Sequence, residues 1–258
     1  RVWEERFGEH AYLPLVTAIA TAAVVLAILF KFYLLAILVT VVIAGLFIYG
    51  GQSAGHTRDY GPLPIGRGIS VPPHTEVAST PPWMAMVCTL VADGTLFASL
   101  VFGTFYLWLA APNWPSAVAF NPNRILALGV LAGLVVAAMA ARRALRALVT
   151  GGKPQGWIAL AMLSLVLAIA AVAGLIGGVI PHPREHALGA TAAALLSYIA
   201  VHGGIGLLFL PSNLLRIRAG MVSALRHTDL RLTRLWLAFT AVTGAIALAQ
   251  GLAMSTMV

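Results

Sequence analysis

Two side chains that can carry a proton lie inside long apolar stretches of the chain, Asp93 and His202. Asp93 lies in the stretch 81–112, which is long enough for a helix to cross a bilayer with some tilt. It is the only carboxylate on any long apolar segment. A carboxylate at membrane depth costs several kcal/mol, so Asp93 marks a candidate functional site.

Asp93 and His202 are expected at the same depth. Asp93 follows Trp83 by ten residues on a helix that enters from the inner side, and His202 precedes Leu210 by eight residues on a helix that leaves to that side. A rise of 1.5 Å per residue places both roughly 12–15 Å from the inner ends of their helices. If the two helices are neighbours, the side chains can hydrogen-bond directly or through water.

Small residues flank both positions, Gly94 beside Asp93 and Gly203 and Gly204 beside His202. Such residues let helix backbones approach closely, so we expect these glycines to bind lipid or to pack helices. One interpretation is a buried polar site that binds a lipid head group or a proton, or tunes the proton path of a partner. The other is a purely structural hydrogen bond between the two helices, with Asp93 protonated and His202 neutral, that only sets helix register. The sequence leaves both open.

The composition indicates a polytopic membrane protein. Of the 258 residues, 60% are hydrophobic and 9% are charged, and the mean hydropathy is +0.93. A water-soluble domain could not bury this much apolar surface. The apolar runs predict an all-α protein with seven transmembrane helices, at about residues 12–30, 32–49, 81–112, 125–148, 157–180, 187–210 and 235–254.

These runs divide the chain into three parts. Residues 1–50 are predicted to form a two-helix hairpin that turns at Lys31. Residues 51–82 are rich in Gly and Pro and show neither helical nor strand periodicity, which predicts an extended cytoplasmic connector. Residues 83–258 form a five-helix bundle, so the helices are grouped two plus five. A basic amphipathic segment is expected at 211–234, before the last helix.

The distribution of basic residues predicts the orientation. With seven spans, thirteen of the sixteen Lys and Arg residues lie on the side of the N-terminus, and only Lys31, Arg124 and Arg184 lie on the other. The positive-inside rule then places the N-terminus inside and the C-terminus outside. The net charge of +8 therefore faces anionic lipid, and no nucleic-acid partner is expected.

No metal site, haem site or catalytic residue is expected in this chain. His182 and His186 are spaced i,i+4 across an outer turn, but Pro183 lies between them and a third ligand is missing. A membrane b-type haem commonly takes two axial histidines from within spans, and only His202 lies in one. The single cysteine, Cys88, can form neither an intrachain disulfide nor a CxxCH haem attachment.

Three segments resemble subunit III of the haem–copper cytochrome c oxidases. They are GPLPIGRGISVPPHTEV, PPWMAM and ADGTLFASLVFGTFYLWLAAPNWP. They are more narrowly similar to the bacterial form in which subunits I and III are fused. The grouping of two plus five helices, the inside N-terminus, the acid in the third helix and the His-Gly pair in the sixth agree with that family. A fused origin would explain why the chain opens at Arg1.

The resemblance implies both a fold and a function. It implies a V-shaped bundle whose lipid-filled cleft lies between the helix pair and the five other helices. The chain would be an accessory, cofactor-free section of a proton-pumping terminal oxidase in the bacterial inner membrane. It would pack on the catalytic subunit I, which holds the haem and copper, in a complex that also contains subunit II. It would hold phospholipid, sustain proton uptake and protect against inactivation during turnover.

By this resemblance, Asp93 corresponds to the buried glutamate of helix three, and His202 to the first histidine of the His-Gly-x-His pattern in helix six. The chain differs from the family in three ways. Its acid is one methylene shorter, Ile205 replaces the second histidine, and AVAGLIGG stands where a Gln-x-x-Glu-Tyr pattern is usual. The alternative functions are an independent seven-helix transporter or channel that uses Asp93 and His202, and a purely structural scaffold. A transporter of that kind should show an internal repeat, and none is visible.

Overall fold

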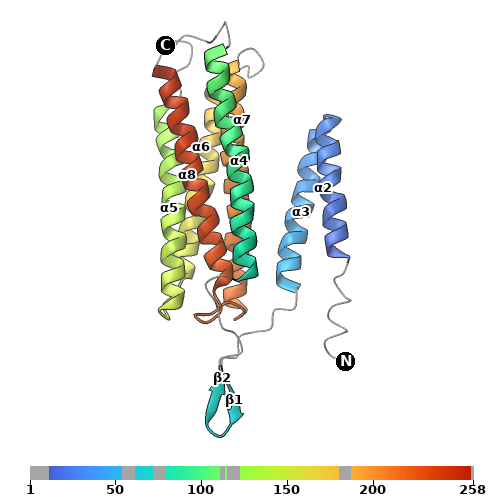
Figure 1. Ribbon diagram of the computed structural model, residues 1–258, viewed down its shortest axis with the longest axis vertical. Helices are drawn as coiled ribbons and strands as arrows, with labels where there is room; N and C mark the ends of the chain where they lie inside the picture. Colours follow the sequence, from blue (N-terminus) through green and yellow to red (C-terminus); the bar gives the residue numbers. More distant parts are fainter. Residues whose placement is uncertain are drawn as a thin grey trace.

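The computed structural model describes residues 12–53, 62–71, 80–110, 114, 123–179 and 187–256. Over these ranges the chain is predominantly helical, in agreement with the predicted all-α class (Figure 1). The helices are α2 (Leu13–Leu29), α3 (Tyr33–Ser53), α4 (Pro81–Ala110), α5 (Arg124–Val149), α6 (Gln155–Val179), α7 (Ala187–Arg218) and α8 (Thr228–Thr256). One hairpin is formed by β1 (Leu63–Gly66) and β2 (Ile69–Val71).

Six of the described helices, α3 to α8, are long and apolar enough to cross a membrane. The chain therefore has the character of a multi-pass membrane protein. The remaining helix, α2, is apolar but has only 17 residues, about 26 Å at 1.5 Å per residue. A seventh span at α2 stays a prediction.

A tight turn at Lys31 joins α2 to α3, as the sequence predicts. Lys31 adopts a left-handed conformation, with φ of 63°. Its backbone N–H donates to the Ile28 carbonyl at 3.0 Å, and that of Phe32 donates to the Ala27 carbonyl at 2.7 Å. These bonds satisfy carbonyls that the end of α2 would otherwise leave free.

The connector predicted at 51–82 contains regular structure, so that prediction was wrong in part. The helix α3 continues to Ser53, the two strands pair within the connector, and α4 already begins at Pro81. With four and three residues, the strands are too short for a period of two to be visible in the sequence. Gly66 and Gly68, with φ of 97° and 75°, supply the backbone freedom that their turn requires.

The basic segment expected at 211–234 is not a separate element. The helix α7 runs through Pro211 to Arg218, and α8 begins at Thr228. Pro211 has no N–H to donate to the carbonyl of Leu207, yet the helix continues past it. It ends at Arg218, and Gly220 in the following turn has a φ of 71°. The basic residues of this stretch therefore belong to two helix ends and the turn between them.

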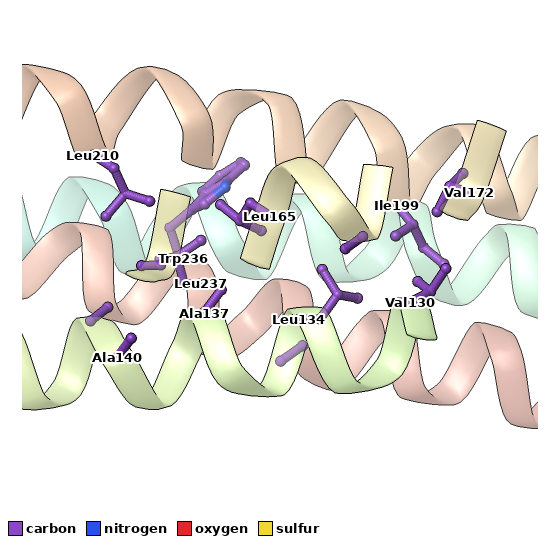
Figure 2. Packing of buried hydrophobic residues seen from close by; sticks show 14 of the residues in the cluster. Val130, Leu134, Ala137, Ala140, Leu165, Val172, Ile199, Leu210, Trp236 and Leu237 are labelled. Carbon is purple, nitrogen blue, oxygen red and sulfur yellow. The ribbon is translucent and has the colours of Figure 1, made fainter. Parts of the chain in front are cut away.

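Small residues let α5, α6, α7 and α8 pack closely. A Cβ atom placed on Gly133 of α5 would lie 2.8 Å from the Ser164 carbonyl oxygen and 2.9 Å from the Ala168 Cβ, both on α6. Gly244 of α8 is in similarly close contact with the Leu134 side chain. The apolar core between the helices includes Val130, Leu134, Ala137, Leu165, Val172, Ile199, Leu210 and Leu237 (Figure 2). Close approach of this kind is how helices associate in lipid, where no hydrophobic force drives them together.

The helices α4, α7 and α8 form the part of the structure that positions the candidate site. The helix α4 packs against both α7 and α8, and α7 packs against α6 and α8. The helices α2 and α3 pack on each other and stand beside the other helices (Figure 1). The main contact of this pair with the other described helices is between α3 and α7.

Candidate functional site

The structure brings Asp93 and His202 into direct contact. Asp93 lies on α4 and His202 on α7, and the His202 Nε2 is 2.8 Å from the Asp93 Oδ2. Both side chains are largely withdrawn from the surface, at 16% exposure for Asp93 and 7% for His202. The equal depth predicted from the helical rise therefore holds, and the two helices are neighbours. The role of the pair stays a proposal.

Tyr198 is a third member of the contact between Asp93 and His202. The sequence analysis did not identify it. It lies one turn before His202 on α7, and its hydroxyl donates to the same Asp93 Oδ2 at 2.6 Å. One carboxylate oxygen thus binds two side chains of the neighbouring helix. The spacing of four residues between a tyrosine and a buried histidine is the sequence signal that could have indicated it, because such residues share a helix face.

The surroundings of His202 fix which of its nitrogens carries a proton. The Nδ1 lies 2.8 Å from the Tyr198 carbonyl oxygen, which can only accept a hydrogen bond, so the Nδ1 is the donor. The Nε2 then meets Asp93 in one of two arrangements. Either a protonated Asp93 donates to a neutral imidazole, or an imidazolium donates to a carboxylate. In both arrangements Asp93 and His202 share one proton in their hydrogen bond.

Two aromatic rings stack on the imidazole of His202. The ring of Tyr198 stacks on it at 3.9 Å between centroids, and the ring of Trp236 stacks at 5.1 Å with an interplanar angle of 6°. The Trp236 Nε1 also donates to the His202 carbonyl oxygen at 3.0 Å, which ties α8 to the site. Trp236 was likewise missed, because the sequence does not show how α8 is rotated about its axis. The ring orientation of His202 is thus set by packing on two helices.

The predicted glycines differ in what surrounds them. A Cβ on Gly203 would lie 3.2 Å from the Ile169 side chain of α6, which makes it a helix-packing residue. On Gly94 it would meet only the Phe239 ring at 3.9 Å, an ordinary contact. On Gly204 it would meet nothing within 4 Å. Gly204 is therefore not a packing residue, and a contact with lipid at this position stays a prediction.

A groove of about 630 Å³ lies between α3 and the helices α4, α7 and α8. Most of its wall is apolar and comes from α3 and α7, with side chains that include Ile43, Phe47, Ile205, Leu208 and Phe209. Polar side chains of α7 and α8 line one part of it, namely Ser212, Asn213, Arg216, Asp229 and Thr233. The groove therefore joins an apolar channel to a polar region, which suits an amphipathic ligand.

The polar region of the groove leaves two buried atoms without a bond among the described residues. Arg216 forms an ion pair with Asp229 at 3.0 Å. Asn213 donates through its Nδ2 to the Thr233 hydroxyl at 2.6 Å and to the Phe209 carbonyl at 2.9 Å. The Asn213 Oδ1 and the Arg216 Nε have no partner in the described part of the chain. An unpaired buried polar atom is costly, so these two atoms mark the place beside the groove where hydrogen bonding is incomplete among the described residues.

Of the six histidines outside the spans, one is described by the structure. His10, His56, His74, His182 and His186 lie outside the described residues. His227 is described, and its Nδ1 lies 2.9 Å from the Ala224 carbonyl oxygen in the turn before α8. Among the described residues, no group of three or more His, Cys, Asp and Glu side chains could hold a metal ion.

Comparison with known proteins does not assign the chain to a family. No protein-family model matches the chain, and no curated protein matches it. Its function must therefore be argued from its own residues and their geometry.

Proposed function

We propose that this chain is the accessory, cofactor-free subunit III of a proton-pumping cytochrome c oxidase, or the equivalent section of a fused subunit I and III. The contact of Asp93 with His202 is the observation that carries the proposal. The acid and the histidine correspond to the residues that the resemblance places in helices three and six. Their hydrogen bond joins two helices more than a hundred residues apart in the sequence, which supports a functional pair.

The proposed topology has seven spans in the bacterial inner membrane, with the N-terminus inside and the C-terminus outside. In this arrangement α2 and α3 form one arm of a V, and α4 to α8 form the other. The packing of α2 on α3, apart from the mutual contacts of the other helices, supports the grouping. The excess of Lys and Arg on one side supports the orientation.

The groove between α3 and α7 supports the proposed lipid binding. An acyl chain fits its apolar wall, and the polar region offers a place for the head group. The Arg216 Nε and the Asn213 Oδ1 are both buried beside the groove, and a small movement of the two side chains would let the Nε donate to a phosphate oxygen and the Oδ1 accept from an ammonium or hydroxyl group. A bound phospholipid would thereby satisfy both free atoms.

In this function the chain supports chemistry carried out by its partner. Haem and copper belong to the catalytic subunit I, and subunit II completes the core of the complex. Asp93 and His202 share one proton and lie among aromatic rings. One such pair is too little for a complete proton wire. Its proposed contribution is to keep the arrangement of α4, α7 and α8, and the lipid beside them, that sustains proton uptake by the catalytic subunit.

Purification of the tagged full-length protein in a mild detergent tests the proposal. We expect it to carry haem absorbance, from a partner chain or from a fused catalytic section, and to consume oxygen with reduced cytochrome c. Asp93→Ala, which removes the hydrogen bonds that hold this arrangement, should then shorten the lifetime of the enzyme during turnover. Thr89→Val, at an exposed position of α4, should not. A chain that purifies alone and without haem would overturn the proposed function and favour an independent transporter.

A further inference from the structure

The junction of α5 and α6 carries four cations close together. Arg142, Arg143 and Arg146 lie near the end of α5, and Lys153 lies in the turn before α6. All four residues are exposed. The junction lies at the same end of the structure as the β1–β2 hairpin (Figure 1). These four residues are called the basic cluster below.

The basic cluster has no counter-charge in the part of the chain that the structure describes. None of its four side chains forms an ion pair or a hydrogen bond with a described residue. The sequence has no acidic residue between Asp93 and Glu185, so neither α5 nor α6 can supply one. The helix α8 packs on α5, and its single acid, Asp229, is already paired with Arg216. An anion from outside the described chain is therefore needed to neutralise the cluster.

The end of α5 does not need these cations for its own folding. The Thr150 hydroxyl donates to the Arg146 carbonyl at 2.9 Å, and the Gly152 N–H donates to the Ala147 carbonyl at 2.7 Å, so terminal carbonyls are capped by other groups. The helix dipole favours a cation only in the last turn, where Arg146 lies. Arg142 precedes Arg146 by four residues, a spacing at which like charges repel each other and destabilise a helix. An anion bound beside both arginines would remove this repulsion.

An apolar stripe on α5 leads directly to the basic cluster. Leu128, Val135 and Met139 are 61%, 38% and 52% exposed, and their spacing of seven and four residues places them on one face of the helix. Arg142 and Arg146 continue this face, three and seven residues beyond Met139. Because α5 is long and apolar enough to cross a membrane, its exposed apolar side chains suit hydrocarbon. The two arginines then lie where the stripe reaches the head groups.

Trp157 connects the basic cluster to α6. The Arg143 guanidinium lies over its indole ring, 5.0 Å from the centroid. Tryptophan at the end of a span is typical of the membrane–water interface. This contact therefore holds one cation of the cluster at the level of the head groups and between the two helices.

We propose that the basic cluster binds the head group of an anionic phospholipid whose acyl chains lie along the apolar stripe of α5. A phosphate oxygen accepts charge-assisted hydrogen bonds from arginine, and four or more Lys and Arg residues together at the end of a span attract anionic lipid. Free phosphate and an acidic protein surface match the cations alone, whereas one phospholipid molecule matches the cations and the stripe. The site is separate from the groove, which is lined by described residues of α3, α4, α7 and α8. The inference does not depend on the proposed function, because it needs only that α5 and α6 cross a membrane.

Native mass spectrometry tests the proposal on the full-length protein, together with any chains that copurify with it in a mild detergent. The delipidated protein is titrated with phosphatidylglycerol and, separately, with phosphatidylethanolamine. Arg142→Gln combined with Arg146→Gln should weaken the binding of phosphatidylglycerol about thirtyfold, since each cation near an anionic head group contributes about fivefold. The binding of phosphatidylethanolamine should stay within about twofold, because this lipid has no net charge. Inorganic phosphate at the concentration of the lipid should not displace phosphatidylglycerol.

Two further pairs of substitutions separate a local site from net charge. Lys31→Gln combined with Arg124→Gln removes the same charge from exposed positions at the opposite end of the helices (Figure 1) and should leave the binding of phosphatidylglycerol unchanged. Arg142→Lys combined with Arg146→Lys keeps the charge and should keep the binding within about threefold.

Four results would overturn the proposal. Undiminished binding of phosphatidylglycerol to the glutamine pair at Arg142 and Arg146 would do so, and this is the result expected if an acidic partner protein covers the basic cluster. An equal loss in the pair at Lys31 and Arg124 would assign the effect to net charge. A parent protein that binds phosphatidylglycerol no more tightly than phosphatidylethanolamine would show no site for an anionic head group. Displacement of the lipid by inorganic phosphate would assign the cluster to a free anion.

Discussion

Tyr198 and His202 lie one turn apart on α7, and both bind the same carboxylate oxygen of Asp93. Their rings also stack on each other, with 3.9 Å between centroids. The position of the Asp93 carboxyl is therefore fixed by two hydrogen bonds from one helix face. Loss of the carboxyl would remove a hydrogen-bond partner from both groups in a poorly solvated place.

Removal of the Asp93 carboxyl should destabilise the protein, and an amide should largely replace it. Asp93→Ala leaves the His202 Nε2 without a partner and the Tyr198 hydroxyl with only the Thr243 side chain, at about 1–3 kcal/mol for an unsatisfied group. In Asp93→Asn, an amide nitrogen can donate to both partners, so the loss should stay below about 1 kcal/mol. Unfolding in mixed detergent micelles measures both values, with Thr89→Val as the control. An Asp93→Ala variant as stable as the parent would show that the hydrogen bonds have no net effect.

His202 should carry a proton on its Nδ1 in every state of the site. The Tyr198 carbonyl oxygen, 2.8 Å away, offers only an acceptor. Nitrogen NMR of protein labelled at histidine can identify this signal by its loss in His202→Gln. The shift should be that of a protonated Nδ1, while the Nε2 shift reports whether the shared proton is on His202 or on Asp93. A neutral ring with a bare Nδ1 would contradict the hydrogen bonding described here.

Gly133 should tolerate no side chain, whereas Gly129, about one turn earlier on α5, should tolerate alanine. A Cβ on Gly133 would overlap the Ser164 carbonyl oxygen of α6, and a backbone atom cannot move aside alone. Gly133→Ala should lower the free energy of unfolding by about 1–3 kcal/mol. A Cβ on Gly129 meets nothing within 4 Å, and alanine there should be neutral or stabilising by up to about 1 kcal/mol. Equal stability of the two variants would mean that α5 and α6 are less close than described.

The sequence predicts the helices and the depth of the site because both depend on local quantities. Length and apolar character identify a span, and the helical rise relates Asp93 to Trp83 and His202 to Leu210. The turn at Lys31 was predictable for the same reason, since a basic residue divides two apolar runs. Each of these inferences uses only residues that are close together in the chain.

What the sequence leaves open depends on how the helices rotate and approach each other. In the sequence, Tyr198 and Trp236 cannot be distinguished from aromatic residues that only pack. Their contacts with Asp93 and His202 depend on how α4, α7 and α8 come together. Pro211 suggests a helix end, but α7 continues through it because one missing hydrogen bond does not outweigh the packing of the following turns. The groove has no sequence signal, since residues of four helices form it.

Asn213 should contribute to lipid retention through its free acceptor. Asn213→Leu removes the Oδ1 from the polar region of the groove, and the loss of one hydrogen bond of about 1 kcal/mol should weaken retention about fivefold. Native mass spectrometry after graded delipidation measures the phospholipid bound to each chain. Thr40→Val is the control, because Thr40 lines the groove but donates to the Ala36 carbonyl of its own helix. Thr233→Val serves as a second control, since it removes the partner of the Asn213 Nδ2 and leaves the Oδ1 in place. Equal retention in all variants would show that no head group binds at Asn213.

The ion pair of Arg216 with Asp229 should fix the start of α8 relative to the end of α7. Arg216 is buried, with a side chain 9% exposed, whereas Asp229 is 32% exposed. Asp229→Asn leaves the buried guanidinium without its counter-charge and should destabilise the protein by about 1–3 kcal/mol, since removal of one partner costs more than the pair contributes. Arg216→Gln combined with Asp229→Asn should recover part of this loss, because no buried charge is then left unpaired. A double-mutant cycle of unfolding free energies in detergent measures the coupling. A double variant whose loss equals the sum of the two single losses would show that the pair does not couple the two helices.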